Sequence, residues 1–171
     1  MITNKTKNIV YYALMIALVC LGTMMIRIPV IATNGYINVG DSFIFIAATV
    51  LGPVGGFLAG GIGSALADLL SGYSHFALFT LIVKGIEGYL VGYLMAKIEI
   101  KNFNLKMIIV YLIGALQMVF GYYLVESFMY GSFITPIPSI FANIVQGGAS
   151  VIIGSLMVIS IYKTNYFKKA I

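Results

Sequence analysis

Residues 43–70 of the chain read FIFIAATVLGPVGGFLAGGIGSALADLL, and this stretch decides how the chain folds. Asp68 is its one charged residue, so the stretch is apolar enough for the interior of a bilayer. It is interrupted by Gly52-Pro53-Val54-Gly55-Gly56. Proline blocks the continuation of a helix, and glycine accepts the dihedral angles of a tight turn. We therefore predict two helices, at 40–52 and 54–71, joined by a turn at the Gly-Pro step.

The composition of the whole chain indicates an integral membrane protein. Of its 171 residues, 61% are hydrophobic and 9% are charged, and the mean hydropathy is +1.04. A soluble domain carries roughly a quarter charged residues, so the bilayer must be the solvent for most of this chain. We predict an all-α bundle forming a single transmembrane domain over residues 1–171, with six transmembrane helices at 9–27, 40–52, 54–71, 77–96, 107–128 and 137–162.

The positive charges give an orientation for these helices. The cytoplasmic face of a membrane protein carries an excess of Lys and Arg. Placing both termini in the cytoplasm puts eight of the ten basic residues on that face: Lys5, Lys7, Lys97, Lys101, Lys106, Lys163, Lys168 and Lys169. These residues stand in small groups beside spans, where anionic lipid headgroups explain them and nucleic acid is not needed.

Polar side chains inside the predicted spans gather at one depth. Ionisable groups are costly in hydrocarbon, so each one is a candidate for function. In the predicted orientation nearly all of them fall in the outer half, which indicates a binding pocket open to the outside. A through-channel would instead need polar lining along its whole length. The candidate ligand-binding residues are Tyr36, Asn38, Asp41, His75, Lys84, Glu87, Tyr122, Glu126, Asn143 and Gln146.

Helical spacing leaves alternatives open for some of these residues. Lys84 and Glu87 are three residues apart and share a face, as do Asn143 and Gln146. Lys84 and Glu87 can simply neutralise each other, or Glu87 can pair with another helix, and the two amides can bond between helices without touching a ligand. Asp68 is expected to be a structural cap or the partner of a loop.

The sequence disfavours an enzyme, a metal-binding protein and a self-sufficient transporter or channel. Neither Cys20 nor His75 has the partner that a catalytic nucleophile, base or metal site needs, so no catalytic residue, metal site or enzymatic activity is predicted. A self-sufficient small transporter or channel is the main alternative. It would need a polar path to the inside, and the predicted inner halves are apolar.

Several short motifs together resemble the S components of energy-coupling-factor (ECF) vitamin transporters. They are the Ala13/Ala17 pair, Asn38-Val39-Gly40-Asp41, Gly52-Pro53-Val54-Gly55-Gly56, Ala67-Asp68-Leu69-Leu70-Ser71-Gly72-Tyr73 and Lys84-Gly85-Ile86-Glu87-Gly88. Within that family the chain is most similar to the group associated with hydroxymethylpyrimidine and pyridoxine uptake.

The resemblance implies a location and a set of partners. A substrate-binding subunit of this kind lies in the bacterial cytoplasmic membrane and docks through small residues of its first helix, here Ala13 and Ala17, on a membrane-embedded T component carried by two ATPases. The segment Ile28 to Ile37 would act as a lid. The chain has no Gly-x-x-x-x-Gly-Lys-Ser/Thr loop. It is therefore expected to hold no cofactor, with ATP and Mg²⁺ bound by the partner ATPases.

The ligand expected from this resemblance is a small ring. The chain has no tryptophan, whereas the thiamine-binding members of the family rely on Trp-rich pockets, so thiamine is disfavoured. Pyridoxine and hydroxymethylpyrimidine both fit a site with Lys84, Glu87, Asn143 and Gln146. Pantothenate, with its carboxylate near Lys84, fits less well.

Overall fold

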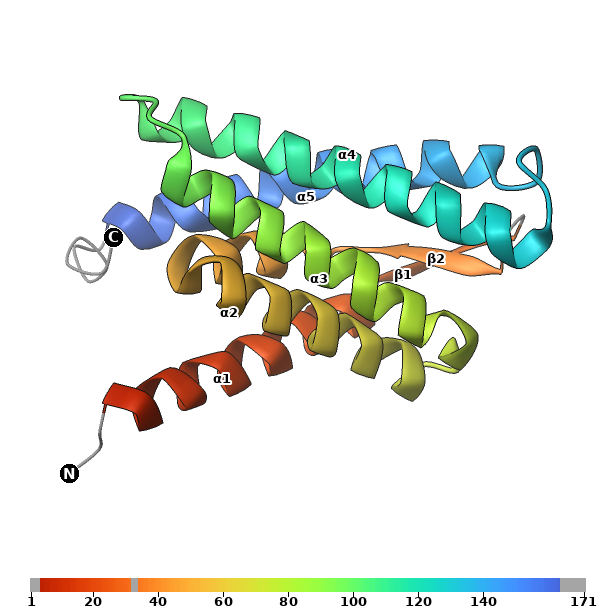
Figure 1. Cartoon of the computed structure of the whole chain (residues 1–171), viewed down its shortest axis with the longest axis horizontal. Coiled ribbons are helices and arrows are strands. Elements are labelled where there is room, and N and C mark those ends of the chain that lie inside the picture. Colours follow the sequence, from red (N-terminus) through yellow and green to blue (C-terminus); the bar gives the residue numbers. More distant parts are fainter. Residues whose placement is uncertain (1–3, 32–33, 164–171) are drawn as a thin grey trace.

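The computed structural model describes residues 4–31 and 34–163, which form a bundle of long helices with one small hairpin (Figure 1). Five of the described helices are long and apolar enough to cross a membrane, as predicted for an integral membrane protein. The described elements are α1 (Asn4–Met25), β1 (Arg27–Val30), β2 (Gly35–Asn38), α2 (Gly40–Leu70), α3 (Ser74–Lys97), α4 (Phe103–Tyr130) and α5 (Ile137–Lys163).

Helix α2 reverses direction at Gly52, where the sequence predicts a turn. Gly52 has φ 72° and ψ −166°, a conformation that glycine adopts most easily. Residues at equal distances from Gly52 meet: a Cβ placed on Gly60 would lie 3.1 Å from Cγ2 of Ile44. In a straight helix these two residues would be about 24 Å apart. The two arms of α2, 40–51 and 53–70, therefore pack against each other in opposite directions.

The count of six membrane-spanning helices stays a prediction. The first arm of α2 has only twelve residues, which as a helix is about 18 Å long. The hydrocarbon core of a bilayer is about 30 Å thick. Five long helices are found where the sequence predicts six spans because the predicted spans 40–52 and 54–71 are the two arms of the single helix α2. By itself the first arm is shorter than the hydrocarbon core.

The second arm of α2 packs closely on α3, and α2 also contacts α1 and α5. A Cβ on Gly56 would overlap with the carbonyl oxygen of Gly88, and a Cβ on Gly60 would overlap with the carbonyl oxygen of Lys84. The glycines of this arm thus form a helix-packing surface, since glycine lets two backbones approach this closely.

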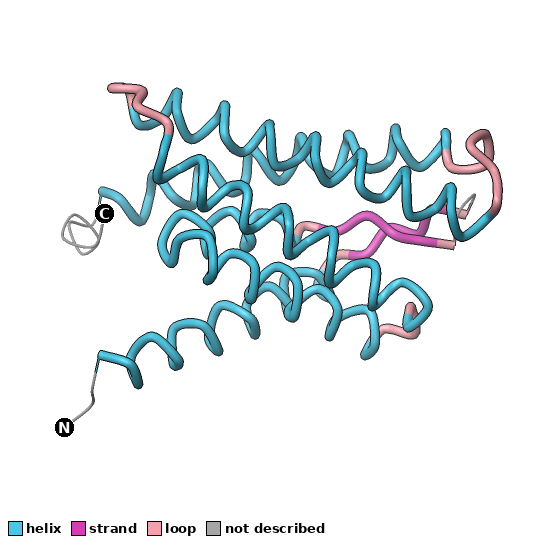
Figure 2. The backbone as a smooth tube through the Cα atoms, in the orientation of Figure 1, coloured by secondary structure: helices cyan, strands magenta, loops and turns pink. Residues whose placement is uncertain are grey.

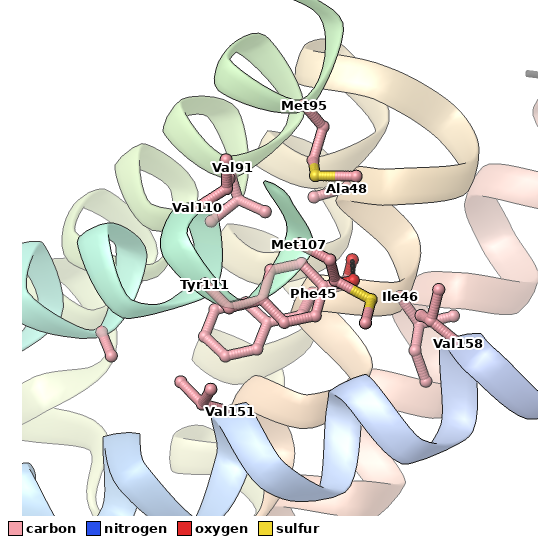
Figure 3. Packing of buried hydrophobic residues seen from close by; sticks show 11 residues of the cluster. Phe45, Ile46, Ala48, Val91, Met95, Met107, Val110, Tyr111, Val151 and Val158 are labelled. Carbon is pink, nitrogen blue, oxygen red and sulfur yellow. Dashed lines mark hydrogen bonds between the residues drawn. The ribbon is translucent and has the colours of Figure 1, made fainter. Parts of the chain in front are cut away.

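An apolar core fills one half of the bundle, which we call the apolar half (Figure 3). The rings of Phe45 and Tyr111 stack with centroids 4.6 Å apart. The hydroxyl groups of Tyr111 and Thr49 lie 2.7 Å apart and form a hydrogen bond. The buried residues of this core are Phe45, Ile46, Ala48, Val91, Met95, Met107, Val110, Tyr111, Ala115, Val151 and Val158.

The hairpin β1–β2 lies toward the other end, which we call the hairpin half (Figure 2). The connections after α2 and after α4 lie at the same end, whereas the start of α1, the end of α5 and the connection from α3 to α4 lie at the opposite end. The helix ends therefore alternate as the predicted topology requires. Which end faces the cytoplasm stays a prediction, and Lys168 and Lys169 lie outside the described residues.

Candidate functional site

The hairpin is fastened over the bundle by hydrogen bonds to α2 and α5. Strand β1 pairs antiparallel with β2, with Arg27 opposite Asn38 and Pro29 opposite Tyr36. The Tyr36 hydroxyl donates a hydrogen bond to Oδ1 of Asp68 at 2.6 Å, near the end of α2. The backbone N–H of Asn38 donates to Oε1 of Gln146 on α5 at 2.8 Å. Asp68 is thus the partner of a loop segment, as the sequence predicts.

Tyr36 is suited to the role of a hydrogen-bond donor. Its ring lies against the ring of Tyr73, with centroids 4.5 Å apart. Burial raises the pKa of the Tyr36 hydroxyl well above its ordinary value, and the neighbouring Asp68 carboxylate raises it further. The phenol therefore keeps its proton at neutral pH and donates a hydrogen bond to Asp68.

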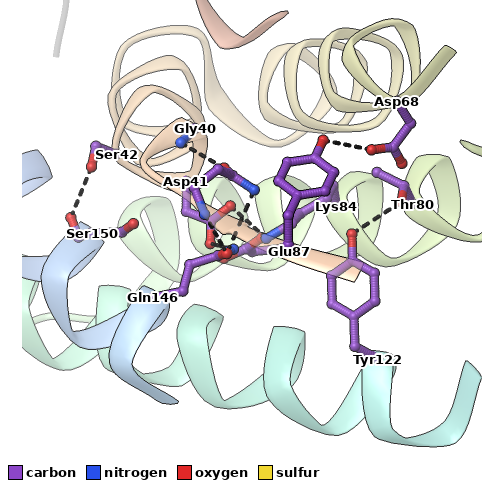
Figure 4. Close-up of polar contacts among 12 residues, drawn as sticks. Gly40, Asp41, Ser42, Asp68, Thr80, Lys84, Glu87, Tyr122, Gln146 and Ser150 are labelled. Atoms are coloured by element: carbon purple, nitrogen blue, oxygen red, sulfur yellow. Dashed lines mark hydrogen bonds and ion pairs between the residues drawn. The ribbon is translucent and has the colours of Figure 1, made fainter. Parts of the chain in front are cut away.

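A buried charged cluster lies beneath the hairpin (Figure 4). The Lys84 ammonium forms an ion pair with Oδ1 of Asp41 on α2, and it lies 3.1 Å from Oε2 of Glu87, one turn along α3. All three side chains are at most 2% exposed. Lys84 and Glu87 do form an ion pair, which was one of the alternatives left open by the sequence. Lys84 also contacts a second carboxylate, that of Asp41, which helical spacing does not identify.

Gln146 connects this cluster to the hairpin. Its Nε2 donates to Oδ2 of Asp41 at 2.8 Å, while its Oε1 accepts from Asn38. One amide therefore donates to the charged cluster and accepts from the hairpin. Gln146 thus links the hairpin to the carboxylate of Asp41.

A second group of polar side chains lies beside the cluster. The hydroxyl of Tyr122 on α4 donates to Oγ1 of Thr80 on α3 at 3.1 Å, and the Lys84 ammonium lies 5.5 Å from the centroid of the Tyr122 ring. Figure 4 shows Asp68 and Tyr122 approaching Thr80 from opposite sides. Nearby, the Ser139 hydroxyl donates to Oε2 of Glu126.

These groups enclose a cavity of about 40 Å³ under the hairpin. A cavity of this size holds water but no ring, since sites for small organic ligands measure about 300–1,000 Å³. It is lined by Thr23, Val30, Gly35, Tyr36, Asn38, Ser64, Asp68, Phe76, Thr80, Lys84, Tyr122, Glu126, Ser139, Asn143 and Gln146. The lining comes from the hairpin and from all five helices, so the tertiary fold builds it.

Seven of the ten predicted ligand-binding residues line this cavity: Tyr36, Asn38, Lys84, Tyr122, Glu126, Asn143 and Gln146. Asp41 and Glu87 adjoin it through Lys84. His75 is exposed at the start of α3 and does not line the cavity, with its ring 4.7 Å from that of Phe76. Phe76 faces the cavity instead because one residue turns the helix by about 100°.

Several lining residues were missed by sequence reasoning, although helical spacing carries a signal for some of them. Phe76 and Thr80 precede Lys84 at intervals of four, so all three share one face of α3. Ser139 precedes Asn143 at the same interval on α5. Extending each predicted face by one or two turns would have found these residues. The described residues include no group of three His, Cys, Asp or Glu side chains that could hold a metal ion.

Two predicted docking residues lie on a free face of α1. Ala13 and Ala17 are four residues apart and both are exposed. The first half of α1 extends away from the rest of the bundle in Figure 1. The neighbouring side chains Ile9, Val10 and Leu14 are also more than half exposed. This surface is therefore available to lipid or to a partner helix.

The sequence is similar to a known family and to individual known proteins. Residues 3–163 match the model of the family described as "ECF-type riboflavin transporter, S component". The thiamine precursor transporter HmpT of Lactococcus lactis subsp. cremoris (strain MG1363) is 29% identical over 172 aligned positions, which cover 98% of this chain and 97% of that protein. An uncharacterized protein of Pyrococcus woesei is 40% identical over 132, covering 77% of this chain and 86% of that one.

Proposed function

This chain belongs to the family of ECF-type transporter S components, and we propose that it captures a small vitamin or vitamin precursor from outside the cell, with hydroxymethylpyrimidine or pyridoxine favoured. The substrate-binding role follows from the family. The choice of ligand is supported by the relative that is named a thiamine precursor transporter. It is also supported by the absence of tryptophan from the chain.

The observation that carries the proposal is the polar cavity closed by the hairpin above an apolar half. A flat heterocycle can lie against Tyr36 and Tyr122 while its ring nitrogens and hydroxyl groups meet side chains of α3 and α5. In our proposal Lys84, Asn143 and Gln146 supply those hydrogen bonds. Asn143 lines the cavity and is 8% exposed, and its side chain forms no hydrogen bond with residues 4–31 or 34–163.

Binding requires the hairpin to move. The present cavity has no room for a ring, so the hairpin must lift from Asp68 and Gln146 to admit one and then close again. Among the described residues, Tyr36 is bonded to Asp68, Asn38 is bonded to Gln146 through its backbone and its amide, and the Tyr36 ring lies against Tyr73. Each such hydrogen bond contributes only about 1 kcal/mol net. The closed position is therefore stable enough to retain a ligand and weak enough to open.

Transport then depends on partners. We propose that Ala13 and Ala17 form part of the surface that docks on a T component of the bacterial cytoplasmic membrane. Two ATPase subunits would bind ATP and Mg²⁺ and supply the energy. Small residues in this position let a partner helix approach closely, which is the main source of helix association within a bilayer.

The test is a binding screen on the detergent-solubilised chain, by calorimetry and thermal shift. The ligands are pyridoxine, hydroxymethylpyrimidine, thiamine, pantothenate, riboflavin, biotin and folate. We expect tight binding of pyridoxine or hydroxymethylpyrimidine. Asn143→Ala should weaken it on the order of tenfold or more, because one buried hydrogen bond is worth about 1–3 kcal/mol when its partner is left unpaired.

Asn104→Ala is the matched control, since Asn104 is an exposed asparagine at the opposite end of the bundle. It should leave affinity unchanged. Binding of none of these compounds would contradict the proposal. Uptake by the chain expressed alone, without a T component or ATPases, would favour the self-sufficient transporter instead.

A further inference from the structure

The ionisable side chains of the molecule are distributed very unevenly. The chain contains five acidic residues, and four of them are buried in the hairpin half: Asp41, Asp68, Glu87 and Glu126. Of its ten basic residues, Lys84 is the buried one within the described part of the chain. Acidic groups therefore outnumber basic groups around the cavity.

Lys84 does not balance this excess of acidic groups. Its ammonium is already shared between Asp41 and Glu87. The other basic groups of this end, Arg27 on β1 and His75 on α3, are exposed and do not line the cavity. A carboxylate or phosphate in the cavity would meet carboxylates and, within the described part of the chain, no free cation, which weighs against pantothenate.

Asp68 indicates which ligand group the acidic side chains around the cavity would bind. It lines the cavity and is 3% exposed. Its Oδ1 accepts the hydrogen bond from Tyr36, but its Oδ2 is buried without a hydrogen-bond partner among residues 4–31 and 34–163. A buried carboxylate oxygen is costly unless a donor or cation reaches it. Glu126 on α4 also lines the cavity and adds a second carboxyl group.

We infer that the site selects its ligand by charge. It accepts an uncharged or cationic heterocycle that carries an amino group, which donates to Oδ2 of Asp68, and it rejects the phosphorylated or carboxylated forms of the same ring. This inference rests on the proposed function and narrows it. Of the two favoured ligands, hydroxymethylpyrimidine has the amino group and pyridoxine does not.

The test compares matched ligands on the full chain in detergent, by calorimetry. Hydroxymethylpyrimidine and pyridoxine are each measured beside their phosphate monoester and beside an uncharged ester of similar size. The phosphate should bind on the order of 100-fold more weakly than the free alcohol, because a like charge about 6 Å away in a partly buried site repels by that much. The uncharged ester should lose much less.

Three variants locate the origin of the discrimination. Asp68→Asn and Glu126→Gln each remove one negative charge and keep an oxygen that accepts from Tyr36 or Ser139, and each should reduce the ratio of alcohol to phosphate affinity about tenfold. Glu99→Gln removes the same charge from the one exposed acidic residue, at the opposite end, and should leave the ratio unchanged.

The outcomes separate this inference from the proposed function. Equal binding of alcohol and phosphate, or equal exclusion of the phosphate and the uncharged ester, would overturn charge selection while vitamin binding stands. An unchanged ratio in both Asp68→Asn and Glu126→Gln would also overturn it. Binding of neither ring in any form would overturn the proposed function, and charge selection with it.

Discussion

Asp41 and Phe45 lie one turn apart on α2, yet Asp41 has polar neighbours and Phe45 has apolar ones. Asp41 meets an ammonium and an amide from α3 and α5. Phe45 stacks on Tyr111 of α4 within an apolar core. Helix α3 changes in the same way between Glu87, paired with Lys84, and Val91, which is fully buried in that core. The boundary between the two halves is a single helical turn.

This boundary bears on whether the molecule works as a receptor or as a channel. The hairpin half offers donors and acceptors around a cavity, whereas the described residues of the apolar half fill it with a packed hydrophobic core. A pore would need polar groups along its length. The difference therefore favours a receptor that must move as a whole, or hand over its ligand, over a channel.

Removing Lys84, the one buried cation among the described residues, should have the largest effect on this arrangement. Lys84→Met keeps the length of the side chain and leaves the carboxylates of Asp41 and Glu87 facing each other. Breaking a buried ion pair from one side costs about 3–5 kcal/mol. We expect a loss of that order in the free energy of unfolding, together with loss of ligand binding, measured by thermal and denaturant unfolding in detergent.

Lys97→Met is the matched control, because Lys97 is exposed in the last turn of the same helix. It should change stability by less than about 0.5 kcal/mol. Equal stability of the two variants would mean that the charged cluster does not hold the hairpin half together.

The second prediction concerns the close approach of α2 and α3. Gly88→Ala places a Cβ against the carbonyl oxygen of Gly56, where neither backbone can give way without separating the helices. Overpacking of this kind costs about 1–3 kcal/mol. Gly148→Ala is the control, since an added Cβ there meets nothing within 4 Å, and it should be neutral or slightly stabilising. Unfolding in detergent measures both, and equal effects would contradict the backbone contact.

Much of this architecture could be predicted because a bilayer leaves few choices. Long apolar stretches must be helical, so residues 77–96, 107–128 and 137–162 fall within α3, α4 and α5. The turn at Gly52 follows from the residues that allow it. Polar groups are too costly in hydrocarbon to be there by chance, which is why Lys84, Asn143 and Gln146 could be picked from the sequence.

What could not be predicted depends on contacts between distant segments. The strands at Arg27–Val30 and Gly35–Asn38 carry a weak local signal, and they are stabilised by each other and by bonds to Asp68 and Gln146. The ion pair of Lys84 with Asp41 joins residues 43 positions apart. His75 was included for its chemistry, but whether it faces the cavity depends on where α3 begins.

The smallest predicted effect comes from the same substitution made in each half. Tyr36→Phe and Tyr111→Phe each delete one hydroxyl and keep the ring. In Tyr36→Phe the hairpin loses its bond to Asp68, so a bound ligand should dissociate about three- to tenfold faster, corresponding to about 1 kcal/mol. In Tyr111→Phe the lost bond to Thr49 lies in the apolar half, so dissociation should not change, while stability falls by about 0.6 kcal/mol, the average for such bonds in membranes. Dissociation rates measured by stopped flow would decide, and equal rates in the two variants would mean that Tyr36 does not fasten the lid.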